Sequence, residues 1–210
     1  MSELTYQAEN NTGLEYFEWD WTWFDNAPDK DSDRILVIGD SITVGYRTIL
    51  SKVAGGRYFV DGIATSKGVD NPAFTALIDY VMPQLGNTKV VLINNGLHGW
   101  HLSADDYEKH YDALVKHITG KYSDMKFVIV TTTPARSKEN IKEFAENYSE
   151  ILERNKRATK IAEKYGVAVF DAFSVVAGQI NLYSPDGVHL KEDGYELIAK
   201  ELNEFITKLL

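Results

Sequence analysis

Residues 35–41 read Ile35-Leu36-Val37-Ile38-Gly39-Asp40-Ser41, a continuous apolar run that stops at a glycine and two polar residues. Apolar runs without alternation are typical of strands buried on both faces, as in a parallel sheet. An amphipathic helix is predicted directly after this run, from Ile42 to Val53. Ser41 is therefore expected at the point where a buried strand becomes a helix.

The same alternation of strand and helix continues to the C-terminus. Further strands are predicted at residues 57–60, 89–93, 126–130 and 167–170, and helices at residues 74–85, 103–118, 141–165 and 192–209. Alternating elements favour one α/β domain with a mainly parallel, five-stranded sheet between layers of helices. In such sheets the chemistry lies outside the carboxyl ends of the strands.

The first 33 residues differ from the rest and are expected to form an acidic, aromatic extension that packs on a domain spanning residues 34–210. Phe17, Trp19, Trp21 and Trp23 alternate with polar residues, which places them on one face of an extended strand. This aromatic face either covers an apolar patch of the domain or forms an exposed platform for sugar rings or a partner.

The overall composition excludes several classes of protein. The chain has 210 residues and a formal net charge of −9, so its surface repels phosphate backbones and nucleic acid is not an expected partner. It contains no cysteine, which excludes disulfides, thiolate nucleophiles, cysteine-bound zinc and iron–sulfur clusters.

Neither a transmembrane segment nor a secretory signal is visible in the sequence. No apolar run approaches the ~20 residues that a membrane helix needs. The N-terminus lacks a basic region followed by an apolar stretch. The sequence as given therefore favours a cytoplasmic protein, or a secreted or periplasmic one if a signal segment has been removed, and it leaves the oligomeric state open.

Ser41 is the first candidate for chemistry. A serine at the start of a helix has unpaired backbone N–H groups beside it, and these can stabilise an oxyanion on a bound ester carbonyl. The alternative is that Ser41 only caps the helix.

A second candidate segment, residues 184–190, lies between the last predicted strand and the last predicted helix. It contains Asp186 and His189, spaced so that one turn brings the carboxylate to the imidazole. Histidine is the usual base that activates a serine hydroxyl, and a carboxylate orients it. Alone, this spacing is a weak pattern that a surface loop also satisfies.

Together, Gly39-Asp40-Ser41 after the first predicted strand and Asp186-x-x-His189 near the C-terminus resemble the SGNH hydrolases, also called GDSL-type esterases and lipases. The resemblance covers the chain from about residue 34 onward. It implies a flavodoxin-like three-layer α/β/α sandwich and ester hydrolysis through an acyl-enzyme, without a cofactor. By resemblance, Ser41 is the nucleophile, His189 the base and Asp186 the acid that orients it.

The chain departs from this family's pattern in the groups that bind the oxyanion. By resemblance the oxyanion hole contains Ser41, with Ser66 where the family has a glycine and His98 where it has an asparagine. A backbone N–H survives the change to serine, and an imidazole N–H can donate as an amide does. Alternatively, His98 is structural and Asn95 or a backbone group donates instead.

A metal site is not expected. His98 and His101 could be grouped with Asp40, Asp186 and His189, but their spacing matches no zinc motif.

The sequence thus predicts a serine esterase whose substrate is a small-molecule or carbohydrate ester. Deacetylation of a carbohydrate is favoured because a polar rim with aromatic residues is expected, with Trp100, Tyr46, Tyr183 and the tryptophan face near Trp21 in it. Alternatives are a lipid-acting esterase, thioesterase or lysophospholipase, and a catalytically weakened protein of the same fold that binds glycans.

Overall fold

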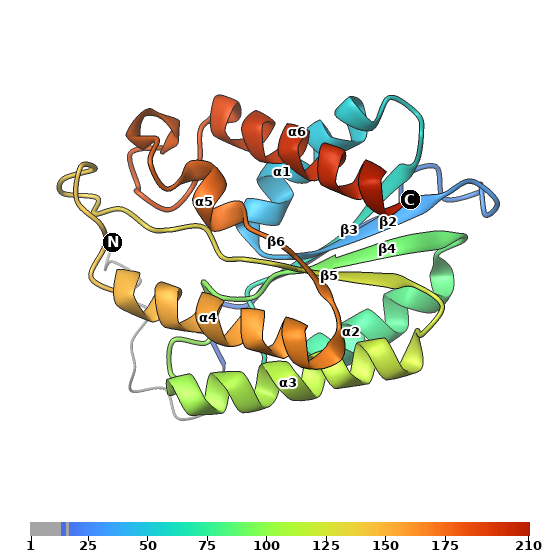
Figure 1. Ribbon diagram of the computed structural model, residues 1–210, viewed down its shortest axis with the longest axis horizontal. Coiled ribbons are helices and arrows are strands. Elements are labelled where there is room, and N and C mark those ends of the chain that lie inside the picture. The colour runs from blue at the N-terminus through green and yellow to red at the C-terminus, as the bar shows by residue number, and fades with distance from the viewer. Residues whose placement is uncertain (1–13, 16) are drawn as a thin grey trace.

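The predicted strands lie side by side in one sheet of the computed structural model, which describes residues 14, 15 and 17–210 (Figure 1). In this part of the chain, six strands have the order β1-β3-β2-β4-β5-β6. The five parallel strands are β2 (Arg34–Gly39), β3 (Phe59–Thr65), β4 (Thr88–Ile93), β5 (Lys126–Val130) and β6 (Ala168–Phe170). The mainly parallel α/β architecture is confirmed.

Helices cover both faces of this sheet (Figure 1). On one face lie α1 (Ser41–Ala54), the short α5 (Ala172–Val176) and α6 (Glu192–Leu209). On the other lie α2 (Pro72–Val81), α3 (Ala104–Lys121) and α4 (Tyr148–Tyr165). Two short 3-10 helices, η1 (Met82–Gln84) and η2 (Ile180–Leu182), complete the connections.

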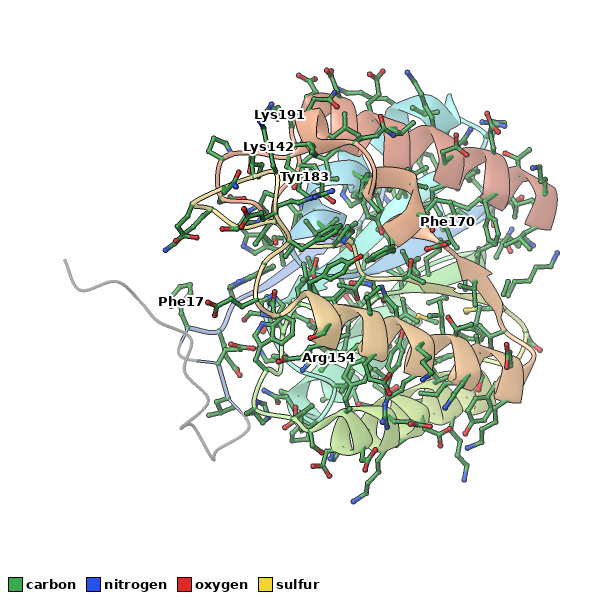
Figure 2. All side chains as sticks on the ribbon, turned by 60° about the vertical axis from the view of Figure 1, so that its left-hand side comes forward. Phe17, Lys142, Arg154, Phe170, Tyr183 and Lys191 are labelled. Carbon is green, nitrogen blue, oxygen red and sulfur yellow. The ribbon has the colours of Figure 1, made fainter. Side chains whose placement is uncertain are left out.

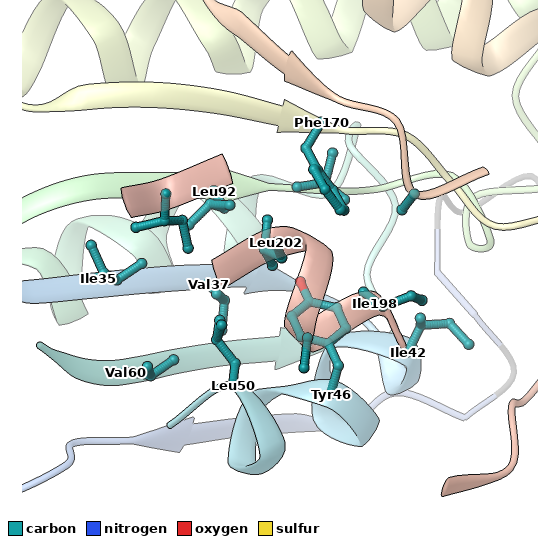
Figure 3. Close-up of a cluster of buried hydrophobic side chains, with 14 of the residues drawn as sticks. Ile35, Val37, Ile42, Tyr46, Leu50, Val60, Leu92, Phe170, Ile198 and Leu202 are labelled. Carbon is teal, nitrogen blue, oxygen red and sulfur yellow. The ribbon is translucent and has the colours of Figure 1, made fainter. Parts of the chain in front are cut away.

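The continuous apolar run of β2 is explained by the two cores on either side of it. Ile35 and Val37 face α1 and α6, where they join Leu50 and Leu202 in the cluster of Figure 3. Leu36 and Ile38, which point to the other face of the strand, lie against α2 and α3 in the second cluster. Burial of both faces removes the polar alternation that a one-sided strand would show.

The N-terminal extension supplies a sixth, antiparallel strand, β1 (Asp20–Trp23), at the edge of the sheet beside β3. Residues 1–13 and 16 of the expected extension lie outside the described residues. Trp23 packs against Gly62 and Arg47, whereas Trp21 is 54% exposed and Phe17 62% exposed. Figure 2 shows Phe17 at the outer edge of the molecule. One end of the aromatic face thus covers the domain, and the other end is open to solvent.

The second predicted strand was too short. β3 continues beyond residue 60 to Thr65, through an Asp-Gly pair that locally resembles a turn. Asp61 is fully buried because Arg34 pairs with it at 2.7 Å, and Gly62 is required because a Cβ there would lie 2.7 Å from Arg47 Cδ. Both reasons depend on residues that are distant in the sequence.

The fourth predicted helix was too long. α4 begins at Tyr148 rather than at Ile141, and the residues before it form turns and a bridge between Arg136 and Phe144. The Phe144 ring stacks on Tyr148 with centroids 3.7 Å apart and lies under the Arg136 guanidinium. The apolar period of residues 141–147 therefore reflects packing on a neighbouring segment and not a helix.

In the described part of the chain, no helix combines the length and the apolar character needed to cross a membrane.

Candidate active site

Ser41 is held at the carboxyl end of β2 by the residues on either side of it. Asp40 caps α1, because its Oδ1 accepts a hydrogen bond from the Ile42 N–H at 2.9 Å. Gly39 allows close packing, since a Cβ there would lie 2.1 Å from Thr43 Oγ1. Ser41 is the first residue of α1, where backbone N–H groups have no partner within the helix.

His189 lies on a tight loop between η2 and α6. The loop is closed by a hydrogen bond of 2.9 Å from the Ser184 N–H to the His189 carbonyl. Gly187 has a φ of 76°, which favours glycine, and its carbonyl accepts from the Arg136 N–H at 2.7 Å. These contacts fix the direction of the imidazole by backbone geometry.

The structure brings together three of the residues singled out from the sequence. His189 Nε2 lies 2.9 Å from Ser41 Oγ, and His189 Nδ1 lies 2.8 Å from Asp186 Oδ2. A carboxylate only accepts, so Nδ1 carries the proton and Nε2 is free to accept from the serine hydroxyl. This is the geometry that a general base needs.

Asp186 is held as a carboxylate. Burial would raise its pKa, but hydrogen bonds from the His189 imidazole, from the backbone N–H groups of His189 and Val188, and from the Ser184 hydroxyl lower the pKa to about 2. The negative charge is therefore present throughout the pH range in which an imidazole titrates.

A cavity of about 350 Å³ opens beside these three side chains. Its lining combines the predicted site with aromatic and apolar residues from several segments: Glu15, Trp19, Ser41, Leu97, His98, Trp100, Ala135, Asn147, Asp186, Val188 and His189. Glu15 and Trp19 come from the N-terminal extension. Trp19 belongs to the aromatic face predicted from the sequence, whereas no sequence pattern pointed to a role for Glu15 in the site.

The three expected oxyanion-binding residues are placed differently. His98 lines the cavity with Ser41, whereas Ser66 does not. The Ser66 N–H donates to the Trp19 carbonyl at 3.2 Å, because the chain before β1 continues to pair with the end of β3. This contact disagrees with the expected role of Ser66. The Asn95 amide, considered as an alternative donor, is also engaged elsewhere, since it donates to the Lys67 carbonyl at 2.8 Å.

Arg154 is a residue that the sequence reasoning missed. It is buried on α4 (Figure 2), and burial lowers the pKa of its guanidinium. It donates to the carbonyls of Gly96, His98 and Gly99 at 2.7–3.0 Å and stacks on Trp100. An arginine on the apolar stripe of a helix was the signal that could have revealed it.

The expected aromatic rim is only partly present. Trp100 lines the cavity, but Tyr46 and Tyr183 are each 2% exposed and belong to the core. Their hydroxyls are accommodated inside the protein, and burial raises the pKa of both. From the tryptophan face that was also expected in the rim, Trp19 lines the cavity, and the neighbouring Trp21 lies with its ring centroid 5.8 Å from that of Trp19.

The histidines considered as metal ligands belong to separate pairs. His98 Nδ1 lies 3.5 Å from Glu15, and His101 Nε2 lies 2.8 Å from Asp70. Among the residues that the structure describes, no group of three or more His, Asp or Glu side chains is placed to hold a metal ion.

A comparison with protein-family models matches residues 37–197 to the GDSL-like lipase/acylhydrolase family. The chain belongs to this family. It is accordingly a hydrolase that acts on esters, as the two sequence motifs predicted. A search of the curated proteins found no match for this acylhydrolase.

Solved structures share the fold of this acylhydrolase. A carbohydrate acetylesterase from Sinorhizobium meliloti superposes with a TM-score of 0.71 at 14% identity, over 85% of this chain and 100% of that one. An aryl esterase from M. smegmatis gives 0.68 at 18% identity, over 85% and 100%. An acetyl xylan esterase gives 0.64 at 21% identity, over 82% and 99%. At these identities the similarity establishes the fold.

Proposed function

We propose that this protein is a serine esterase that hydrolyses carboxylic esters through an acyl-enzyme at Ser41. The observation that carries the proposal is the continuous chain of contacts from Ser41 Oγ to His189 and on to Asp186, at 2.9 and 2.8 Å. Family membership gives the reaction class, and the chain of contacts supports the residue roles.

The proposed reaction has two halves. The Ser41 Oγ attacks the ester carbonyl while its proton passes to His189 Nε2, and a tetrahedral oxyanion forms. The oxyanion collapses, the C–O bond to the alcohol breaks, and the alcohol leaves with the proton from His189. Water then attacks the acyl-serine, with His189 again as base. Release of the carboxylic acid regenerates the Ser41 hydroxyl.

The oxyanion is proposed to bind between the first turn of α1 and the 96–100 loop. The Ser41 N–H supplies one donor, and the His98 imidazole, which lines the same cavity, supplies the other. Ser66 is left out of this arrangement, because its N–H already donates to Trp19. Fixed donors of this kind stabilise negative charge as it develops, without reorganisation during the reaction.

The decisive experiment is Ser41→Ala, assayed with activated short-chain esters. Hydrolysis should fall at least ~10³-fold while the protein stays folded, and a fluorophosphonate probe should label the wild type but not the variant. Ser123→Ala, at an exposed serine outside the cavity, is the matched control and should keep full activity. A Ser41→Ala protein that retains most activity would overturn the assignment.

The acyl group and alcohol that we propose are an acetyl group on a carbohydrate. Trp19 and Trp100 line the cavity, and Trp21 lies exposed beside Trp19. Aromatic rings provide flat apolar surfaces on which the C–H faces of sugars can pack. Two structural neighbours are a carbohydrate acetylesterase and an acetyl xylan esterase, which supports the same substrate class.

Trp21→Ala tests this substrate class. It should raise KM for an acetylated oligosaccharide and leave KM for a small activated acetate unchanged, because only the larger substrate extends beyond the cavity. Tyr80→Ala, at an aromatic residue on α2 that is even more exposed than Trp21, is the control. A clear preference of the wild type for acyl chains of eight or more carbons would instead favour a lipid-acting esterase.

A further inference from the structure

Glu15 reaches the cavity from outside the part of the chain that matches the family. Its side chain is only 8% exposed. The carboxylate Oε1 accepts a hydrogen bond from the Gly99 N–H at 2.7 Å and lies 3.5 Å from His98 Nδ1. The N-terminal extension thus places a negative charge beside the His98 imidazole, which lines the same cavity.

Arg154 acts on the same peptide from the other side. The His98 carbonyl accepts from the Arg154 guanidinium at 2.7 Å, whereas the N–H of that peptide group, on Gly99, donates to Glu15. In a trans peptide the C=O and N–H point in opposite directions. The His98–Gly99 peptide is therefore held between a carboxylate and a guanidinium, and the backbone that carries the imidazole is fixed.

The tautomer of a neutral His98 follows from the carboxylate beside it. Burial would raise the pKa of Glu15, but hydrogen bonds with His98 and the Gly99 N–H lower the pKa below its usual value. Glu15 is therefore a carboxylate, and the proton of a neutral His98 would lie on Nδ1, facing it. An oxyanion donor at Nε2 then requires the imidazolium, which carries a proton on both nitrogens.

We propose that Glu15 is a positioning residue, which holds His98 as an imidazolium whose Nε2–H donates to the oxyanion. The inference rests on the proposed esterase mechanism and adds to it a counter-ion that the family's usual asparagine does not need. A charged donor forms stronger hydrogen bonds to an anion than a neutral one does. The substitution of histidine for asparagine thus gains a physical explanation.

The titratable groups near His98 come from every element around it. They are Glu15 from the N-terminal extension, Arg154 from α4, Asp186 and His189 from the loop before α6, and the His101–Asp70 pair beside its own loop. Glu15 is the carboxylate paired with the imidazole itself, so its removal should have a specific effect on the pH dependence of the reaction.

Glu15→Gln is the test variant, because it keeps an oxygen that can accept from Gly99 but removes the charge. We expect kcat at neutral pH to fall by about 10- to 100-fold, because the complete loss of one oxyanion donor lowers kcat by about 100-fold or more. The alkaline limb of the kcat profile should move to lower pH, while the acidic limb stays in place. Glu163→Gln, an exposed charge change on α4, should alter neither limb.

His98→Asn supplies an independent measurement. An amide donates without titrating, so the alkaline limb should disappear, and Glu15→Gln should cost less in this background than in the wild type. An unchanged alkaline limb in either single variant would overturn the role of Glu15. If Ser41→Ala is inactive in the same assay, an unchanged alkaline limb refutes only this inference. An active Ser41→Ala would refute the esterase mechanism itself.

Discussion

The Nε2 atom of His189 lies 2.9 Å from the Oγ atom of Ser41, although 148 positions separate the two residues in the sequence. The contact joins the first turn of α1 to the loop before α6. Because α1 and α6 pack side by side on the same face of the sheet, both ends of the contact are attached to one rigid layer. The loop before α6 sets the position of His189, so changes in this loop should alter the distance between His189 Nε2 and Ser41 Oγ.

Gly187→Ala should damage catalysis through this loop. The residue has a φ of 76°, and a Cβ there would lie 2.1 Å from the Arg136 carbonyl oxygen. We expect a loss of about 1–3 kcal/mol in unfolding free energy and a clear fall in kcat. Gly178→Ala is the control, because nothing lies within 4 Å of its Cβ position. Equal labelling rates with a fluorophosphonate for both variants would contradict this prediction.

Asp186→Asn should reduce kcat by about 10³- to 10⁴-fold with little change in KM. The amide retains an oxygen for the backbone N–H groups of Val188 and His189, so the loop should stay folded. It cannot hold the His189 imidazole in the required tautomer or stabilise the imidazolium. Steady-state kinetics and a thermal melt measure the two effects separately, and a kcat within tenfold of the wild type would exclude the proposed role.

Stability at low pH should depend on Asp79, which links α2 to α3. Burial would raise its pKa, but hydrogen bonds from Lys121, His117 and Tyr122 lower the pKa to about 2, below the ordinary value of 3.8 for an aspartate. A lowered pKa in the folded state means that the stabilisation is present above about pH 4 and is lost as the pH falls toward 2. Asp79→Asn should therefore be less stable than the wild type at pH 7.

The difference in unfolding free energy between wild type and Asp79→Asn, measured by urea unfolding between pH 2 and pH 7, should shrink on acidification. A difference that stays constant over this range would show that the charge of Asp79 contributes nothing.

Arg154→Met should destabilise the protein and slow the reaction. Methionine fills a similar space but leaves the carbonyls of Gly96, His98 and Gly99 without their donor. We expect a loss of about 2–4 kcal/mol in unfolding free energy, because unpaired buried polar groups are costly. Lys156→Met, at an exposed position on α4, should change stability by less than ~1 kcal/mol. Similar melting temperatures for the two variants would contradict the assigned role of Arg154.

Much of the fold could be predicted because its signals are local. The runs at β2, β4 and β5 have no polar alternation, which reflects burial on both faces within a few residues of chain. The two errors arose where distant contacts override local patterns. β3 continues through Asp61 because Arg34 neutralises the buried carboxylate. The segment with Phe144 is not helical because the Phe144 ring packs on Arg136 and Tyr148.

The candidate site could be predicted less completely. Ser41, Asp186 and His189 stood out because they occur in short motifs at element ends, and the structure places them in contact. The backbone N–H of Ser66 does not fit the predicted role, because it donates to the carbonyl of Trp19, which precedes β1 and lies more than 40 positions earlier. Glu15 carried no signal, since a single carboxylate in an acidic segment has no pattern to distinguish it.

The sequence by itself determined the order and type of the elements and pointed to the three residues that we propose as nucleophile, base and acid, because periodicity and motifs are properties of neighbouring residues. Only the tertiary structure decided which side chains share the cavity. A loop from near the C-terminus, a buried guanidinium on α4 and a carboxylate from the N-terminal extension converge there because strand pairing and helix packing bring them together, and no short stretch of sequence encodes that meeting.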